Sequence, residues 1–354
     1  MIGKKIRMIC VVILFASITV SRSTAADITM RIAFQAPKTH YSVQSVLFFK
    51  SQVEQRSNGK IQVKIHDYTS WLEEQEANHN KSEEKIKLFF FDKEIPIAIS
   101  NGSLESGMAS LSRFSEDVPL VDIFFQPFLF DTEKKVKLAT DSKSVIRIAI
   151  EREIQNLGLT VLWWQPYGNV VFVSKGEPIR NPEAMRGKKV RVFSRTMGNL
   201  ALSAGGFPVS ISNSRQYFAY KHNKVDIGMT TILEIDRYKT WEVMDTISLS
   251  NSATIQFLIV VNTRWWNSLD FKLKTIISNA AEKAQKFANE KLKEMESNAF
   301  RKALENGMTL EVLSDDDRDY WKEKSFPIYE RYLEDSGPSG QELFDLATET
   351  MLYE

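Results

Sequence analysis

The chain has 354 residues, of which 46 are basic, 45 are acidic and one is a cysteine. Because these charges nearly cancel, the composition excludes a general attraction to nucleic acid or to anionic lipid. A single cysteine excludes an intrachain disulfide, so a hydrophobic core must hold the fold, and a chain of this length can bury one. After the first 26 residues, no segment approaches the roughly 18 apolar residues that a membrane span requires.

The N-terminus has the order of a secretory signal. Three basic residues precede an apolar run at 8–20, and small residues follow at 23–26. The run is short for a bilayer span, so the pattern predicts removal of 1–26 and a mature chain that begins at Asp27; an uncleaved membrane anchor is the alternative. Cys10 lies inside the run and leaves with it. The mature chain then has 42 basic and 45 acidic residues, because the signal carries four of the basic ones, and its net charge is −3.

Apolar periodicity predicts alternating strands and helices. A strand is expected at 28–34, a helix at 43–53 and a strand at 61–65, and this succession indicates a parallel α/β unit. The mixed-charge stretch 71–93 is interpreted as a solvated surface. The remaining elements are expected as a helix at 143–156, strands at 159–164, 170–174 and 188–193, a helix ending at 205–206, a short helix at 214–222 capped by Ser214, strands at 225–229 and 256–261, a long helix at 270–305 and two closing helices.

Short motifs follow one another in a recognisable order. Asn-Gly-Ser-Leu-Glu stands at 101–105, Gln-Pro-Phe-Leu-Phe at 126–130 and Arg-Gly-Lys-Lys-Val-Arg-Val at 186–192. In order and spacing these motifs resemble those of the solute-binding subunits of tripartite ATP-independent periplasmic (TRAP) transporters, the DctP family. Single residues at the same spacing extend the resemblance over most of the mature chain: Pro37, His40, Val53, Glu54, Arg56, Ser57, Gly59, Pro208, Ser214, Tyr217, Val225 and Asp226.

The resemblance implies an α/β fold of the two-lobed periplasmic solute-binding type, type II-like, with a ligand cleft between the lobes and a long helix in the C-terminal half. The expected divisions are 27–166 for lobe I, 167–252 for lobe II, 253–295 for a crossover back to lobe I, and 296–354 for C-terminal helices. The implied function is capture of a small carboxylate in the periplasm and its delivery to the membrane permease subunits of a TRAP transporter.

Family members commonly hold the ligand carboxylate with an arginine at the position of Arg191. A planar guanidinium offers two parallel N–H donors that match two carboxylate oxygens. Without the family, an arginine between Val190 and Val192 would be interpreted as a solvated strand residue. The second arginine usual in the family is replaced by Val170. One carboxylate on the ligand is therefore as plausible as two.

Further ligand-binding residues are expected from the same alignment of motifs. Asn213 replaces an aromatic residue of the family pattern, and Thr230 replaces an asparagine whose hydrogen bonding it can reproduce. Arg215 could supply a replacement cation or lie exposed on a helix. The rest of the expected set is Tyr167 and Phe193, as an apolar wall that could equally be plain core, and Asn169.

Catalysis finds little support in the sequence. The four histidines are not paired at metal-ligand spacing, and no nucleophile elbow, phosphate loop or dinucleotide fingerprint occurs. We therefore expect no enzyme activity, no cofactor, no metal site and no nucleic-acid partner. A periplasmic ligand sensor that docks on a receptor would share the same fold and pocket, and the sequence leaves this alternative open.

Overall fold

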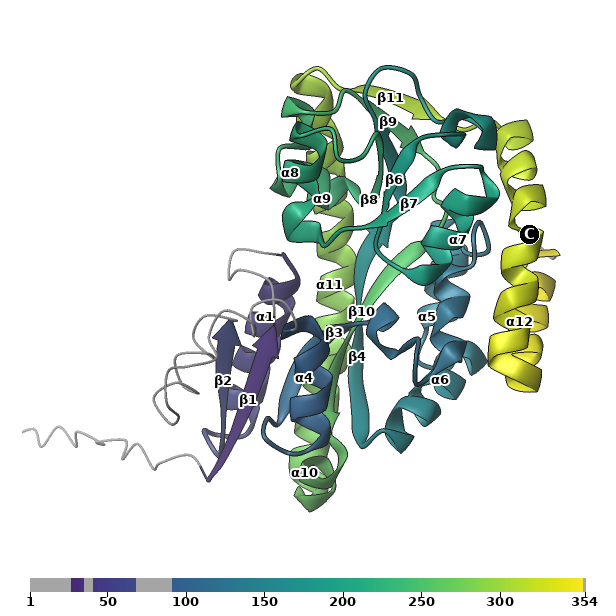
Figure 1. Ribbon diagram of the computed structural model, residues 1–354. Coiled ribbons are helices and arrows are strands. Elements are labelled where there is room, and N and C mark those ends of the chain that lie inside the picture. Colours follow the sequence, from purple (N-terminus) through teal and green to yellow (C-terminus); the bar gives the residue numbers. More distant parts are fainter. Residues whose placement is uncertain (1–26, 35–40, 68–90, 353–354) are drawn as a thin grey trace, which may run out of the picture.

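The computed structural model describes residues 27–34, 41–67 and 91–352, and Figure 1 shows them as two lobes that meet at a waist. Each lobe contains one β-sheet covered by helices. The predicted signal, the motif residues Pro37 and His40, and most of the mixed-charge stretch 71–93 lie outside the described residues.

Lobe I begins with the parallel unit that the sequence predicts. Strand β1 pairs in parallel with β2, in register from Ile28 opposite Ile61 onward, and α1 connects them. The alternate residues Met30, Ile32 and Phe34 of β1 are completely buried. The sheet has the order β2-β1-β3-β10-β4, and its strands are β1 Ile28–Phe34, β2 Ile61–Asp67, β3 Ser106–Ser110, β4 Leu159–Asn169 and β10 Thr254–Asn262. Its helices are α1 Tyr41–Arg56, α4 Phe91–Ser100, α5 Glu133–Thr140, α6 Val145–Asn156 and α10 Thr263–Ser268.

Lobe II is built on a mixed sheet of order β11-β9-β5-β8-β6-β7. Strand β6 pairs in parallel with β7 and with β8, whereas β5 runs antiparallel to β8 and β9. The strands are β5 Val171–Ser174, β6 Lys189–Val192, β7 Phe207–Ser210, β8 Ile227–Thr230, β9 Thr246–Leu249 and β11 Thr309–Val312, and the helices are α7 Arg195–Ser203, α8 Gln216–Lys221 and α9 Ile232–Arg237.

Long elements join the two lobes. Strands β4 and β10 pair antiparallel along their whole length at the waist, and helix α11, Phe271–Glu305, packs on both α1 and α9 (Figure 1). Asp270 caps α11 by accepting a hydrogen bond from the backbone of Leu273 at 2.8 Å. The final element, α12 Asp315–Leu352, contains a non-helical break at Gly337, so it amounts to the two closing helices that the sequence predicts. We call β4 and β10 the crossing strands.

The sequence misplaced one helix start. Ser214 was expected to cap a helix at 214–222, but a 3₁₀ turn covers Asn213–Arg215 and α8 begins only at Gln216. The hydroxyl of Ser214 instead lies 3.3 Å from that of Ser212, because serine side chains bond locally as readily as they cap. Among the described helices, none has a stretch that is both long and apolar enough to cross a bilayer.

Candidate functional site

Arg191 is buried on β6, the second strand from one edge of the lobe II sheet, with 1% of its surface exposed. Its Nε donates to the carbonyl of Ile211 at 2.9 Å and its Nη1 to that of Met229 at 2.6 Å. Its Nη2 donates to Oδ1 of Asn213 at 2.5 Å. A guanidinium has five N–H donors, so these contacts leave one N–H on each terminal nitrogen without a partner among the described residues.

The surroundings of Arg191 exclude water and contain groups that favour a positive charge. Burial lowers the pKa of Arg191, while Tyr220, Glu234 and Tyr238 act in the opposite direction and raise it. Tyr220 can approach because Gly228 stands opposite Arg191 in β8; a Cβ on Gly228 would lie 2.0 Å from the Tyr220 hydroxyl. An arginine stays charged in proteins, so the site presents a desolvated positive charge.

Glu234 brings a carboxylate to the same region from the first turn of α9 and is 1% exposed. The hydroxyl of Tyr167, on crossing strand β4, donates to its Oε1. Nε2 of Gln216 lies 3.5 Å from its Oε2, and Nη1 of Arg237 lies 3.5 Å from its Oε1. The carboxylate therefore contacts Arg237 of its own helix and also groups of two other elements.

Lobe I contributes Tyr41 from the start of α1. Its hydroxyl donates to the carbonyl of Pro166, and its ring lies 5.9 Å from that of Tyr167. Burial raises the pKa of both tyrosines; Glu296 and Glu234 raise that of Tyr41 further, and Glu234 raises that of Tyr167. Polar groups from lobe I, a crossing strand and lobe II thus converge. We call this set the interlobe cluster: Tyr41, Tyr167, Arg191, Asn213, Gln216, Thr230 and Glu234.

Thr230 adds a hydroxyl with spare bonding capacity to the cluster. It is 2% exposed, and its Oγ1 has no hydrogen-bond partner among the described residues. It follows Met229, whose carbonyl accepts from Arg191. Because buried hydroxyls are normally hydrogen-bonded, an unpaired one beside a buried arginine is typical of a place where a ligand or water supplies the partner.

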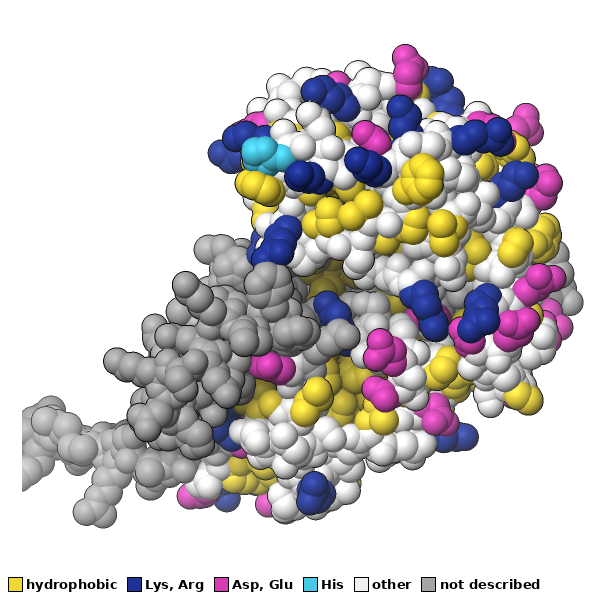
Figure 2. All heavy atoms as spheres, in the orientation of Figure 1, with side chains coloured by type: hydrophobic (Ala, Val, Ile, Leu, Met, Phe, Trp, Pro, Cys, Tyr) yellow, Lys and Arg dark blue, Asp and Glu magenta, His cyan; other side chains and the backbone are white. Residues whose placement is uncertain are grey.

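A cleft opens beside the cluster. Phe193, two residues beyond Arg191 on the same strand, has its ring centre 5.8 Å from the guanidinium carbon and lines a hollow of about 870 Å³. Figure 2 shows this hollow between the lobes, with apolar atoms on its walls. Lobe II also contributes Ser194, Arg195 and Ser210, and lobe I contributes Ser112, Arg113, Ser115 and the end of α4.

One of the residues expected from the sequence lines a different hollow. Asn169 lines a separate groove of about 1310 Å³ that runs between α5, α11 and the start of α12; we call it the hinge groove. Arg215 is exposed, although it shares a 3₁₀ turn with Asn213 and precedes Gln216. The structure brings together Arg191, Phe193, Asn213, Thr230 and Tyr167.

The sequence reasoning overlooked Glu234, Gln216 and Tyr41. Glu234 follows Thr231 by three residues, and Thr231 accepts from its backbone N–H at 3.4 Å, so the pattern resembles an ordinary helix cap. Tyr41 follows a stretch outside the described residues and carries no motif. Their only sequence signal is an acidic or aromatic residue near an expected binding strand, which is too common to single them out.

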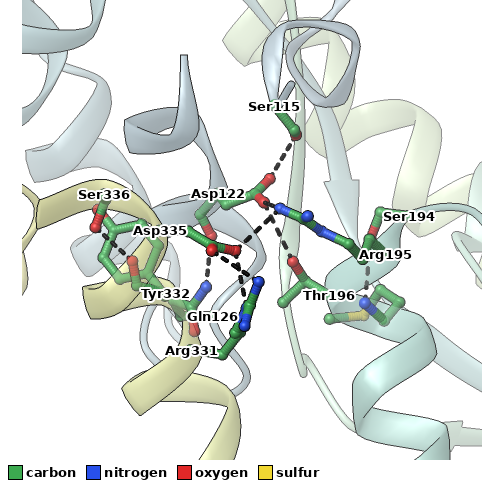
Figure 3. A network of polar contacts seen from close by, with 11 residues as sticks. Ser115, Asp122, Gln126, Ser194, Arg195, Thr196, Arg331, Tyr332, Asp335 and Ser336 are labelled. Atoms are coloured by element: carbon green, nitrogen blue, oxygen red, sulfur yellow. Dashed lines mark hydrogen bonds and ion pairs between the residues drawn. The ribbon is translucent and has the colours of Figure 1, made fainter. Parts of the chain in front are cut away.

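A polar junction closes one side of the waist, as Figure 3 shows. Asp122, from the 3₁₀ turn Pro119–Phe125 of lobe I, accepts from the hydroxyl of Ser115 at 2.5 Å. Arg195, at the start of α7 in lobe II, has its Nη2 4.0 Å from Asp122 and 3.2 Å from Asp335 of α12. Burial raises the pKa of Asp122. The junction thus links both lobes and the C-terminal helix next to the cleft.

A metal centre is not evident in the part of the chain that the structure describes. Within it, no group of three or more histidine, cysteine, aspartate or glutamate side chains is arranged to hold an ion.

Comparison with known proteins gives consistent results. The sequence model of the DctP family, described as bacterial extracellular solute-binding protein family 7, matches residues 32–335. The ectoine-binding periplasmic protein TeaA of Halomonas elongata is 24% identical over 69% of this chain and 73% of its own. The C4-dicarboxylate-binding periplasmic protein DctP of Vibrio cholerae is 22% identical over 70% of this chain and 74% of its own. The crystal structure of DctP7, an extracytoplasmic solute receptor of Bordetella pertussis that binds pyroglutamic acid, superposes with a TM-score of 0.78 at 16% identity, covering 90% of this chain and 99% of that one.

Proposed function

The chain belongs to the DctP family of bacterial extracellular solute-binding proteins, and from this premise we propose that it captures a small organic acid in the periplasm and delivers it to the membrane permease of a TRAP transporter. The observation that carries the proposal is Arg191, a buried cation with two N–H donors to spare. These two donors would bind the ligand carboxylate.

The energetics favour a carboxylate over a neutral ligand. A buried charge without a counterion is costly, and the ligand would supply the missing negative partner. Charge-assisted N–H···O bonds in a site that excludes water are also among the strongest in proteins. Phe193 would cover one face of the guanidinium and exclude water as the cleft closes.

Binding is proposed to close the lobes. Tyr41 belongs to lobe I, Arg191 to lobe II and Tyr167 to a crossing strand, so a ligand that contacts all three gains its full affinity only when the lobes approach. The expected divisions at 166/167 and 252/253 lie in or beside β4 and β10, where we propose that the chain bends. Small-angle scattering should show a smaller radius of gyration with saturating ligand; an unchanged radius with binding verified separately would contradict closure.

The deciding experiment identifies the ligand. Native mass spectrometry of protein purified from its own periplasm should reveal a co-purified acid, and this acid should be recovered with unchanged mass after prolonged incubation, since we propose binding without chemistry. Recovery of a chemically altered product would favour an enzyme. N-terminal sequencing of the same material should begin at Asp27, and a start at Met1 in a membrane fraction would contradict the periplasmic location.

The membrane protein that the ligand-loaded protein binds distinguishes a transport function from a sensor function. The ligand-loaded protein should bind reconstituted TRAP permease subunits more tightly than the ligand-free protein does. Ligand-dependent binding to a histidine-kinase ectodomain, without binding to the permease, would instead support the sensor alternative.

A further inference from the structure

We propose that Glu234 makes the site selective for a monocarboxylate that carries a hydrogen-bond donor, a hydroxyl or an ammonium or amide N–H, next to its carboxylate. This inference rests on the function proposed above, since it names the class of acid that the site would take. It concerns a residue outside the motifs on which the family resemblance depends.

Arg191 and its surroundings match one negative charge on the ligand. Within the cluster, Arg191 brings one positive charge, and Glu234, which is close enough to influence the pKa of Arg191, brings one negative charge. Arg237 lies outside the cluster, 3.5 Å from Glu234, and offsets its charge, so these three groups sum to +1. The position where a second arginine was expected holds Val170, which is completely buried. A dicarboxylate would bring its second charge close to Glu234, and like charges in a low dielectric repel strongly, whereas the arginines of the neighbouring cleft lie outside the cluster.

The unused bonding capacity of the cluster calls for both an acceptor and a donor on the ligand. Arg191 has two spare N–H donors, which match a carboxylate. Glu234 accepts only a long 3.5 Å contact at its Oε2, although each carboxylate oxygen can accept two hydrogen bonds. Thr230 can donate or accept. A ligand hydroxyl or N–H group would fill the free position on Glu234.

The direction of the Glu234 side chain argues against a purely local role. A glutamate at this position of a helix often bonds back to the first residues of its own helix. Here the carboxylate contacts Arg237 of its own helix but also reaches Tyr167 of the crossing strand and Gln216 of α8. A charge that is 1% exposed is expensive to bury, and replacing such groups by apolar ones is often neutral or stabilising. Specific recognition of a ligand would explain why it is there.

The test compares related acids that differ in the donor group or in the number of carboxylates. Isothermal titration would compare lactate and alanine with propionate, which lacks the donor, and with malate and aspartate, which add a second carboxylate. It would also compare glucuronate with glucarate, which has a second carboxylate. Pyroglutamate would be compared with cyclopentanecarboxylate, which lacks the N–H donor. The wild-type protein, Glu234→Gln, Arg191→Ala and the exposed control Glu242→Gln would each be titrated. Glu242 is a suitable control because it lies in the same lobe and bonds only the hydroxyl of Tyr217.

In the set that the wild type binds, the donor-bearing monocarboxylate should bind at least about tenfold more tightly than each acid with which it is compared. Glu234→Gln should reduce this preference roughly tenfold to a hundredfold, because a hydrogen bond to a charged group is lost and the repulsion of the second carboxylate disappears. Glu242→Gln should leave it unchanged. If Glu234→Gln fails to fold, the wild-type comparison and Glu234→Asp, which keeps the charge, decide the matter.

Different results overturn the two proposals. If the wild type prefers the dicarboxylate or the acid without the donor, or if a folded Glu234→Gln protein keeps the wild-type preference while Arg191→Ala loses binding, the role of Glu234 is wrong and the carboxylate function stands. If no acid binds, or if Arg191→Ala binds as well as the wild type, the proposed function itself fails, and the inference fails with it.

Discussion

The interlobe cluster and the hinge groove both lie where the lobes meet, but they differ in their electrostatics. In the cluster, the buried Arg191 faces carbonyl, amide and carboxylate oxygens that stabilise its charge. In the hinge groove, Glu296 of α11 is partly buried with another acid, Glu133, nearby. The groove is larger than the cleft, about 1310 against 870 Å³. The smaller of the two hollows thus lies beside the region where buried polar groups from both lobes converge, and such convergence is typical of ligand sites.

The two regions also respond differently to burial. Burial lowers the pKa of Arg191, which stays protonated because an arginine loses its proton only at very high pH. Burial and the charge of Glu133 raise the pKa of Glu296 to about 7, within the physiological range. The cluster thus keeps a fixed charge suited to binding an anion, whereas the groove contains a group whose charge varies with pH.

The largest expected effect is a loss of ligand affinity when Arg191 of the interlobe cluster is replaced. Arg191→Ala should reduce affinity for the identified acid roughly 30-fold to several thousandfold, equivalent to about 2–5 kcal/mol, because the ligand carboxylate would be buried without its cation. Arg191→Lys should restore only part of the loss, since an ammonium lacks the planar pair of donors. Isothermal titration measures both.

A matched control for this prediction is Arg180→Ala, which removes an exposed arginine of lobe II that pairs with Glu311. It should leave affinity unchanged. Circular dichroism must verify that the Arg191→Ala protein is folded, because unfolding of the lobe would mimic loss of binding. An affinity within about threefold of the wild type, about 0.7 kcal/mol, would place Arg191 outside the ligand contacts.

The next largest effect is a pH-dependent change in the free energy of unfolding, and it arises from Glu296 in the hinge groove. The pKa of Glu296 is about 7 in the folded protein against 4.5 ordinarily, so the folded state holds a proton that the unfolded state releases between these values. The free energy of unfolding therefore falls as pH rises through this window. Glu296→Gln should stabilise the protein at pH 8 by up to roughly 3 kcal/mol and have little effect at pH 4.

Urea unfolding of the wild type and Glu296→Gln at pH 4 and pH 8 measures this difference. Glu305→Gln is a suitable control, because Glu305 lies on the same helix and is already paired with Arg301 at 3.0 Å. Equal stabilisation by Glu296→Gln at both pH values would show that the gain comes from packing rather than from the charge.

A smaller effect is expected at the strand that separates the two regions. Gly168 has a φ of +98°, and a Cβ there would lie 2.5 Å from Oε1 of Glu296. Gly168→Ala should cost about 1–3 kcal/mol in unfolding free energy, from backbone strain together with the clash. In a Glu296→Ala background the clash disappears and the cost should shrink; thermal unfolding of the four proteins tests this, and an undiminished cost would assign the whole effect to strain.

The smallest effect is expected at Asn169. Because its side chain lines the hinge groove rather than the cluster, Asn169→Ala should change ligand affinity by no more than about twofold. The sequence alone places Asn169 among the expected ligand-binding residues. A loss of tenfold or more in isothermal titration would return Asn169 to the ligand site and remove the distinction between the two regions.

The sequence by itself determined the elements whose pattern is local. Alternation in 28–34 and helical spacing after it were enough to predict the parallel unit of lobe I, and a long run of helix-forming residues predicted α11. The motif around Arg191 predicted a strand at 188–193, and β6 covers Lys189–Val192. The sequence predicted the four-residue strands β5, β6 and β8 but not β7 and β11, the edge strands of the same sheet, because most of their side chains are exposed or half-buried and give no apolar pattern. It did not predict β9 either.

Only the tertiary structure decided what surrounds each site residue. Arg191 could have been solvated; it is buried because its acceptors come from Ile211, Met229 and Asn213, which are distant along the chain. Glu234 resembled a helix cap until the crossing strand brought Tyr167 to it.

Tyr167 and Asn169 illustrate the physical reason most directly. Two residues apart on a regular strand, they would share a face. In β4 the pairing with β10 passes from Pro166 opposite Gln256 to Gly168 opposite Ile255, which leaves Tyr167 as an extra residue, and Gly168 adopts a positive φ. This bulge breaks the alternation and turns Tyr167 toward the cluster and Asn169 toward the groove. The period of a strand is fixed by its own residues, but a bulge is fixed by the partner strand against which it forms.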